Sequence, residues 1–126
     1  MLAGTGTDLI EIARIRQSIA RFGQRFLERV FTPGEIAYCE RKKNAAESYA
    51  GRFAAKEAAA KALGTGIARG VSWLEIEVRR APDERPTVHF TGRAASRAAA
   101  MGVTAASLSI THSRELALAT VLLESI

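Results

Sequence analysis

The sequence has few of the residues that form disulfides or metal sites built only from protein ligands. Among its 126 residues are one cysteine, Cys39, and two histidines. A single cysteine cannot form a disulfide within the chain, and it excludes a zinc site built from several cysteines. A reducing compartment is the default for such a chain, so we expect a cytoplasmic protein.

Long apolar runs are also missing. No stretch approaches the roughly 18 consecutive apolar residues that a membrane span requires. No lysine or arginine precedes Arg14, and Asp8 and Glu11 interrupt the apolar start, so we expect neither a signal peptide nor a membrane partner. With 48% hydrophobic and 25% charged residues, the composition predicts one soluble domain over residues 1–126.

The charge is biased toward positive values, with a formal net charge of +5 and a pI of about 10.0. This bias favours anionic partners, including nucleic acid, nucleotides and acidic proteins. A nucleic-acid-binding module is therefore one hypothesis, supported by the basic run Arg41-Lys42-Lys43. Because the few aromatic residues do not alternate with basic ones as a stacking platform requires, we favour a partner other than nucleic acid.

Hydrophobic periodicity predicts an α+β fold with helices packed on a mostly antiparallel sheet. The segment Thr32-Pro33-Gly34-Glu35 has the cap, the proline and the acid that are typical of a helix start. Two pairs of strands are separated by short turns, which predicts two hairpins. The predicted strands are 2–7, 73–80, 86–91, 104–112 and 116–124, and the predicted helices are 9–22, 24–30, 33–41, 45–63 and 92–101.

The helix predicted over residues 45–63 has no broad polar face. At 100° per residue, Glu57 falls within an arc of mostly apolar residues. A carboxylate there is costly unless it meets a cation, and Lys61 lies four residues on. An internal Glu57–Lys61 ion pair and a ligand site both remain open. A helix of this kind is covered on several sides, and another subunit could provide part of that cover.

The segment Gly4-Thr5-Gly6-Thr7-Asp8 is the second unusual feature. In a strand, Gly4, Gly6 and Asp8 share one face, and the glycines leave room for a ligand or another backbone. Asp8 can serve as the N-cap of the next helix, with Glu11 completing a capping box. It can also touch a metal ion, since these interpretations are compatible.

Asp8 and Glu57 are the acids least explained as ordinary surface charge. Magnesium is usually held by one or two carboxylates together with phosphates and water, so these two residues are a candidate magnesium pair. Lys61 and the loop Gly64-Thr65-Gly66 follow Glu57 closely. A lysine can neutralise phosphate, and a glycine loop can offer backbone N–H groups to it.

Two further features have a structural and a functional interpretation. Arg14 and Arg21 are seven residues apart on one face of the predicted helix 9–22. That face is either solvated or a docking surface for an acidic helix. His112 ends an apolar strand face with Leu108 and Ile110, where a structural histidine is the more frequent case.

Three segments resemble the motifs of bacterial holo-acyl-carrier-protein synthases, which are 4'-phosphopantetheinyl transferases. Residues 4–12 (GTGTDLIEI) resemble the first motif, 51–62 (GRFAAKEAAAKA) the second and 109–113 (SITHS) the third. The order of the motifs and the chain length also fit. The turn before Pro86 usually carries a glycine in this family, whereas here it reads Asp83-Glu84-Arg85.

The resemblance implies an enzyme of fatty acid biosynthesis that moves the 4'-phosphopantetheine of coenzyme A onto a serine of apo acyl carrier protein. Adenosine 3',5'-bisphosphate leaves. The resemblance also implies a homotrimer with each active site between neighbouring subunits. Asp8 and Glu57 correspond to magnesium ligands and Lys61 to a catalytic lysine at the coenzyme A phosphates. The other implied residues are Lys43, Arg52, Gly64, Thr65, Thr111 and His112 around coenzyme A, and Arg14 and Arg21 at the carrier protein.

The reaction needs a base for the serine proton, and our hypothesis is Glu57, directly or through a water. In phosphoryl transfer, charge neutralisation and in-line orientation supply most of the catalysis. Besides the nucleic-acid-binding module, the alternative is an inactive trimeric scaffold that keeps the fold but does not use Asp8 and Glu57 for metal.

Overall fold

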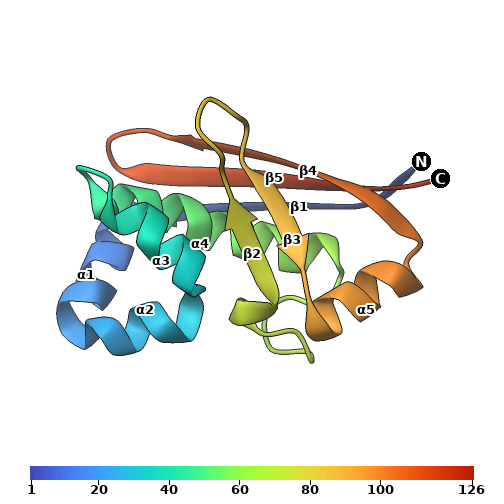
Figure 1. Cartoon of the computed structure of the whole chain (residues 1–126), viewed down its shortest axis with the longest axis horizontal. Helices are drawn as coiled ribbons and strands as arrows, with labels where there is room; N and C mark the ends of the chain where they lie inside the picture. The colour runs from blue at the N-terminus through green and yellow to red at the C-terminus, as the bar shows by residue number, and fades with distance from the viewer.

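The computed structural model describes residues 1–126 and confirms the α+β prediction. A three-stranded antiparallel sheet of order β1-β5-β4 lies along the long helix α4, and β2 and β3 form a separate antiparallel pair (Figure 1). Helices α1 to α3 gather at one end and α5 lies at the other (Figure 1). In chain order the elements are β1 (Leu2–Glu11), α1 (Ile12–Phe22), α2 (Gln24–Val30), α3 (Pro33–Glu40), α4 (Ala45–Ala62), the short 3-10 helix η1 (Trp73–Glu75), β2 (Ile76–Arg79), β3 (Thr87–Phe90), α5 (Gly92–Ala100), β4 (Val103–His112) and β5 (Leu116–Ser125).

Strand β1 continues beyond the predicted end at residue 7. Asp8 and Leu9 lie within the strand and pair with β5. Helix α1 begins at Ile12, and the side chain of its N-cap residue, Glu11, makes no capping hydrogen bond. The predicted capping box of Asp8 and Glu11 is therefore wrong. Pairing with a strand from the far end of the chain outweighs the helix-like spacing of Leu9.

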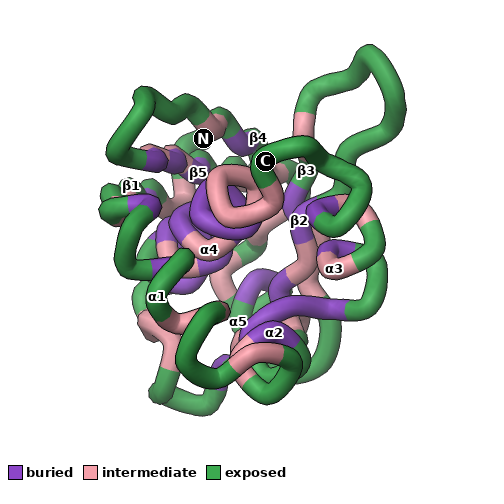
Figure 2. Tube along the Cα trace, turned by 90° about the vertical axis from the view of Figure 1, so that its left-hand side faces the viewer, coloured by how far each residue is buried: buried purple, intermediate pink, exposed green.

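Helix α4 is the central element of the fold. Its buried positions are mostly alanine, so neighbouring elements can come close to the helix backbone. Figure 2 shows α4 among the other elements, coloured largely as buried or intermediate. Ala54, Ala58 and Ala59 are fully buried. The prediction that this helix has no broad solvated face is confirmed.

The two glycines of the first motif allow β1 to approach α4 closely. A Cβ atom at Gly6 would overlap the carbonyl oxygen of Ala58, and one at Gly4 would overlap that of Ala62. The space left by the glycines is thus filled by another backbone, as one of the two interpretations predicted. This approach brings the α4-facing side of β1, including Asp8, against the second half of α4.

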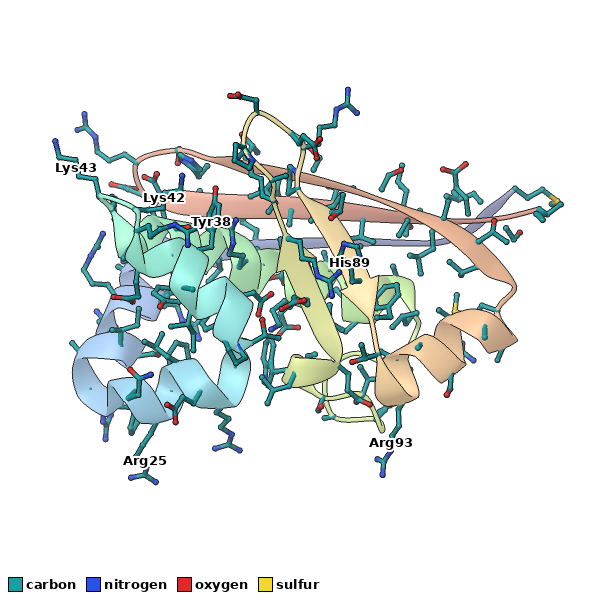
Figure 3. The ribbon with its side chains drawn as sticks, in the orientation of Figure 1. Arg25, Tyr38, Lys42, Lys43, His89 and Arg93 are labelled. Carbon is teal, nitrogen blue, oxygen red and sulfur yellow. The ribbon has the colours of Figure 1, made fainter.

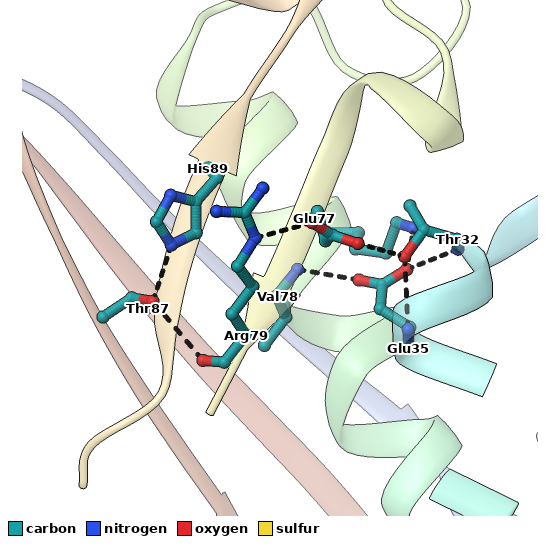
Figure 4. A network of polar contacts seen from close by, with 8 residues as sticks. Thr32, Glu35, Glu77, Val78, Arg79, Thr87 and His89 are labelled. Atoms are coloured by element: carbon teal, nitrogen blue, oxygen red, sulfur yellow. Dashed lines mark hydrogen bonds and ion pairs between the residues drawn. The ribbon is translucent and has the colours of Figure 1, made fainter. Parts of the chain in front are cut away.

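A buried ion pair between Lys56 and Glu35 joins α4 to α3 and was not foreseen from the sequence. Lys56 Nζ lies 2.6 Å from Glu35 Oε1, and both side chains are 0% exposed. The backbone N–H of Val78 in β2 donates to Glu35 Oε2 over 2.8 Å. Glu35 also completes the predicted capping box with Thr32, whose N–H donates to Oε1. Figure 4 shows how these bonds join the start of α3 to β2.

Both predicted hairpins are present. The first begins later than predicted, because Ser72 and Glu75 form a capping box that turns residues 73–75 into the 3-10 helix η1. The turn that lacks the usual glycine places Asp83 at φ 62°, a left-handed conformation that aspartate tolerates better than most residues. None of the helices combines the length and the apolar character that crossing a membrane requires.

Candidate functional site

Asp8, Glu57 and Lys61 form a cluster, here called the carboxylate cluster, where α4 packs on β1. Lys61 Nζ lies 3.0 Å from Asp8 Oδ1 and 3.1 Å from the carbonyl oxygen of Thr7. The Asp8 side chain is only 16% exposed, whereas that of Lys61 is 49% exposed. Of the two interpretations left open for Glu57, the internal ion pair with Lys61 does not form, because the ammonium group pairs with the carboxylate of Asp8 across the helix–strand contact.

The electrostatics of the carboxylate cluster favour an added cation. Burial raises the pKa of Glu57, the neighbouring charge of Asp8 raises it further, and Lys61 partly offsets this. No third acid, histidine or cysteine gathers with them. Two carboxylates without further protein ligands fit magnesium that shares its coordination with phosphate oxygens, rather than an all-protein cage. The residues present therefore fit the predicted magnesium ion.

Gly64 and Thr65 lie at the end of α4, close to Lys61, and their backbone N–H groups are already used. Gly64 adopts φ 79° as a helix stop, as predicted. Its N–H donates to the carbonyl of Lys61, while those of Thr65 and Gly66 donate to that of Ala60. The expectation that this loop offers free N–H groups to a phosphate is therefore wrong. A cation that the sequence did not indicate, Arg97, donates to the carbonyl of Leu63 over 2.8 Å beside this turn.

A cavity of about 490 Å³, here called the basic cavity, lies at the other end of α4. Arg52 lines this cavity and is 6% exposed. Its Nη1 donates to Ser48 Oγ over 3.4 Å, whereas Nε and Nη2 are buried without a partner. Unpaired N–H groups of a buried cation are costly, so this arrangement fits an anionic ligand. The cavity is lined by Tyr38, Lys42, Lys43, Asn44, Glu47, Ser48, Gly51, Arg52, Arg80, Pro86, Ile110 and His112.

Thr111 and His112 point to opposite faces of the sheet, because side chains alternate along a strand. His112 lines the basic cavity, with Nε2 3.4 Å from Glu47 Oε1. Thr111 is exposed on the face turned away from α4 and does not line the cavity. Of the two residues, only His112 is brought together with Lys43 and Arg52.

The predicted site residues thus fall into two groups on opposite flanks of α4. The carboxylate cluster lies beside β1 and the basic cavity beside β4, which are the two edges of the three-stranded sheet. Arg52 and Glu57 are five positions apart, so their side chains leave the helix about 140° apart. Gly64 lies about 18 Å farther along the helix axis than Arg52. One chain therefore does not unite all the predicted coenzyme A residues around one point.

Arg14 and Arg21 are exposed on α1, away from both groups. The guanidinium of Arg21 lies 5.2 Å from the ring centroid of Phe22. Phe22, the last residue of this helix, is 52% exposed. An arginine face with an exposed aromatic ring is compatible with both solvation and docking.

Comparisons with known proteins show the family to which this chain belongs. A sequence profile described as the 4'-phosphopantetheinyl transferase superfamily matches residues 4–121. A relative from Koribacter versatilis, a holo-[acyl-carrier-protein] synthase, is 54% identical over 124 residues, which cover 98% of this chain and 99% of the relative. The chain belongs to the 4'-phosphopantetheinyl transferase superfamily and, within it, to the holo-[acyl-carrier-protein] synthases. The resemblance predicted from the motifs is confirmed.

Solved structures of the same family share the fold. The Helicobacter pylori holo-[acyl-carrier-protein] synthase in complex with coenzyme A has a TM-score of 0.84 at 35% identity, over 95% of this chain and 99% of that one. The Bacillus anthracis holo-(acyl-carrier-protein) synthase, solved with CoA (3',5'-ADP), has a TM-score of 0.83 at 39% identity, over 100% and 99% of the two chains.

Proposed function

We propose that this protein transfers the 4'-phosphopantetheine group of coenzyme A to a serine of apo acyl carrier protein and releases adenosine 3',5'-bisphosphate. The observation that carries the proposal is the Asp8–Glu57–Lys61 cluster in a chain of this family. The reaction breaks the pyrophosphate of coenzyme A, and this cluster has the charges to hold a pyrophosphate with a divalent cation. We place the reaction in the cytoplasm and in fatty acid biosynthesis.

Within the carboxylate cluster, each side chain has a distinct task. Asp8 and Glu57 would hold magnesium, which neutralises the pyrophosphate charge when it is bound. Lys61, half exposed and 3.0 Å from Asp8, can reach a phosphate oxygen and stabilise negative charge on the leaving group. Glu57 is our hypothesis for the group that takes the serine proton, directly or through a water, because its partly buried carboxylate would lie beside the reacting pyrophosphate.

The basic cavity would hold the other anionic group of coenzyme A. Besides the pyrophosphate, coenzyme A carries a phosphate monoester on its ribose. Arg52 lines this cavity with Lys43 and His112, and two of its N–H groups have no protein partner. A phosphate dianion would satisfy these groups with charge-assisted hydrogen bonds.

Homotrimer formation would explain why the two groups of residues are apart in one chain. A carboxylate cluster from one copy and a basic cavity from the next can enclose one coenzyme A molecule. The face of the three-stranded sheet that is turned away from α4 supports such packing. The side chains in the middle of this face are apolar or carry hydroxyl groups, and none of them is charged. Leu9 and Leu122 are 58% and 40% exposed there. Thr111 lies on the same face, where it would meet a neighbouring copy.

The exposed arginines Arg14 and Arg21 on α1 would dock the acidic carrier protein. Docking through exposed charges mainly affects the rate of encounter and its salt dependence. Arg14→Gln and Arg21→Gln should therefore raise the KM for carrier protein and leave the KM for coenzyme A unchanged.

Mass spectrometry of an apo acyl carrier protein incubated with this protein and coenzyme A tests the proposal. We expect the carrier to gain one phosphopantetheine group only with magnesium, and to gain none with Asp8→Ala or Glu57→Ala. Glu115→Gln, an exposed acid outside both groups, is the matched control and should keep the activity. No gain on several carriers with a folded wild-type protein would refute the proposal. Salt-sensitive RNA binding in that case would support the nucleic-acid-binding module.

Light scattering separates the oligomer from the chemistry. A mass of three chains would support the homotrimer, and mixed trimers of Glu57→Ala and Arg52→Ala chains would test sharing of the site. Activity that reappears on mixing two inactive variants would mean that neighbouring copies complete one another. An active monomer would refute the shared site and leave the transferase proposal intact.

A further inference from the structure

The ring of Tyr38 in α3 holds several cations at the basic cavity. Its centroid lies 3.8 Å from Arg52 Cζ, 4.7 Å from Lys42 Nζ and 5.8 Å from Arg41 Cζ. Figure 3 shows Tyr38, Lys42 and Lys43 on the same side of the molecule, away from Arg93 at the start of α5. The face of an aromatic ring carries partial negative charge, so it can gather cations that would otherwise repel one another.

Arg52 depends on this ring because no acid is paired with it. None of the ion pairs in the structure includes Arg52. Its one hydrogen bond, from Nη1 to Ser48 Oγ, is long at 3.4 Å. The other contact that holds the guanidinium is the Tyr38 ring, whose centroid lies 3.8 Å from Cζ. Nε and Nη2 are buried and have no protein partner.

The hydroxyl of Tyr38 experiences the same positive surroundings. Burial alone would raise the pKa of this phenol, but Lys42 and Arg52 outweigh it, so the pKa lies below its usual value. The two cations thus lie close to both the face and the polar end of the same side chain. A residue in this position organises the cavity rather than only filling space.

We infer that Tyr38 is a positioning residue for the phosphate monoester of coenzyme A. Its ring holds the Arg52 guanidinium, which has two N–H groups without a protein partner, at the cavity where that phosphate would bind. Tyr38 thereby sets how strongly the enzyme prefers coenzyme A to dephospho-coenzyme A, which lacks this group. The inference rests on the proposed function and adds a specificity-determining residue that lies outside the three sequence motifs.

Steady-state kinetics of Tyr38→Leu and Tyr38→Phe, with coenzyme A and with dephospho-coenzyme A, test the inference. Leucine keeps apolar volume but has no ring, whereas phenylalanine keeps the ring. We expect Tyr38→Leu to raise the KM for coenzyme A about 5- to 30-fold, the size of a desolvated cation–π contact, with kcat within about twofold. Tyr38→Phe should stay within about threefold of the wild type, because the ring contact remains.

The dephosphorylated co-substrate distinguishes positioning from a general structural role. With dephospho-coenzyme A, Tyr38→Leu should have the same KM as the wild type, since the group that Arg52 binds is absent. A double-mutant cycle adds a second readout: in an Arg52→Gln background, Tyr38→Leu should have little further effect on coenzyme A. Thermal unfolding of each variant confirms that it is folded at the assay temperature.

Each outcome decides a separate question. An equal rise in KM for both co-substrates, or an unchanged KM for coenzyme A in a folded Tyr38→Leu, would overturn the role of Tyr38. Additive effects of Tyr38→Leu and Arg52→Gln would overturn the route through Arg52. The proposed function would fail independently of these results, if the wild-type protein modified no carrier with coenzyme A.

Discussion

Removing the charge of Lys56 should destabilise this protein far more than removing the charge of another lysine on the same helix. Lys56 and Glu35 are both 0% exposed and lie 2.6 Å apart. In Lys56→Met, the Glu35 carboxylate would remain buried and would keep only the N–H groups of Thr32 and Val78 as donors. Breaking one side of a buried ion pair costs about 3–5 kcal/mol. For a chain of this length that corresponds to a fall in Tm of about 12–20 °C.

Thermal unfolding followed by circular dichroism, with Lys61→Met as the matched control, measures this difference. Lys61 lies one turn further along α4 and pairs with Asp8, but its side chain is 49% exposed. An exposed ion pair contributes about 1 kcal/mol or less, so the control should lose only a few degrees. Lys56→Met combined with Glu35→Gln should recover part of the loss, because no unpaired charge is then buried. Equal losses for Lys56→Met and Lys61→Met would refute the reasoning.

Three further predictions address other parts of the fold. Gly6→Ala should cost about 1–3 kcal/mol in a denaturant titration, because its Cβ would overlap the carbonyl oxygen of Ala58; Thr7→Ala on the opposite face of the strand is the control, and equal stabilities would contradict the close approach. The Cys39 thiol is buried and its burial raises its pKa; a thiol reagent at pH 8 should modify it on the order of 100-fold more slowly in the folded protein than in the unfolded one, and similar rates would contradict this. The hydrogen bond from Thr32 and the charge of Arg79 lower the pKa of Glu77, so its carboxylate stabilises the fold above about pH 4.3, the value in the unfolded chain, and this contribution disappears as the pH falls through the lower folded value. Glu77→Gln should therefore lower the Tm at pH 7 but not at pH 2.5, and the same loss at both pH values would argue against an ionised role.

The elements that local patterns specify were predicted well. Helix α4 follows from its alanine-rich composition and the glycine that ends it, and the two hairpins follow from alternation and turn residues. These signals lie within each segment. The predicted boundary between β1 and α1 was wrong, because Leu9 lies three residues before Ile12, and this spacing looks helical when the segment is considered alone. Its pairing with β5, more than 100 residues away, decides the conformation. A local window does not contain that partner.

The site was predicted less completely, for the same reason. The motifs identify Asp8, Glu57 and Lys61, but helix spacing assigned the lysine to the wrong acid, because only the fold brings Asp8 beside it. The sequence also did not indicate that Lys56 is buried, because only the fold places Glu35 of α3 against it. Tyr38 gave no signal at all, since its role depends on how α3 lies against α4. Which side chains pair with one another is decided by the contacts between helices and strands, and not by the residue types alone.

The close packing of α4 on β1 restricts which residues of this protein can be replaced. Its contact with β1 is made of methyl groups and backbone, with Gly4 and Gly6 facing the carbonyl groups of Ala62 and Ala58. Asp8 projects from that strand and Glu57 from that helix, so the separation of the two acids depends on this contact. Any larger side chain placed there would move one acid relative to the other. Directed evolution toward heat resistance should therefore find stabilising substitutions in α5, the loops or the outer sheet face. It should find very few in the contact between α4 and β1.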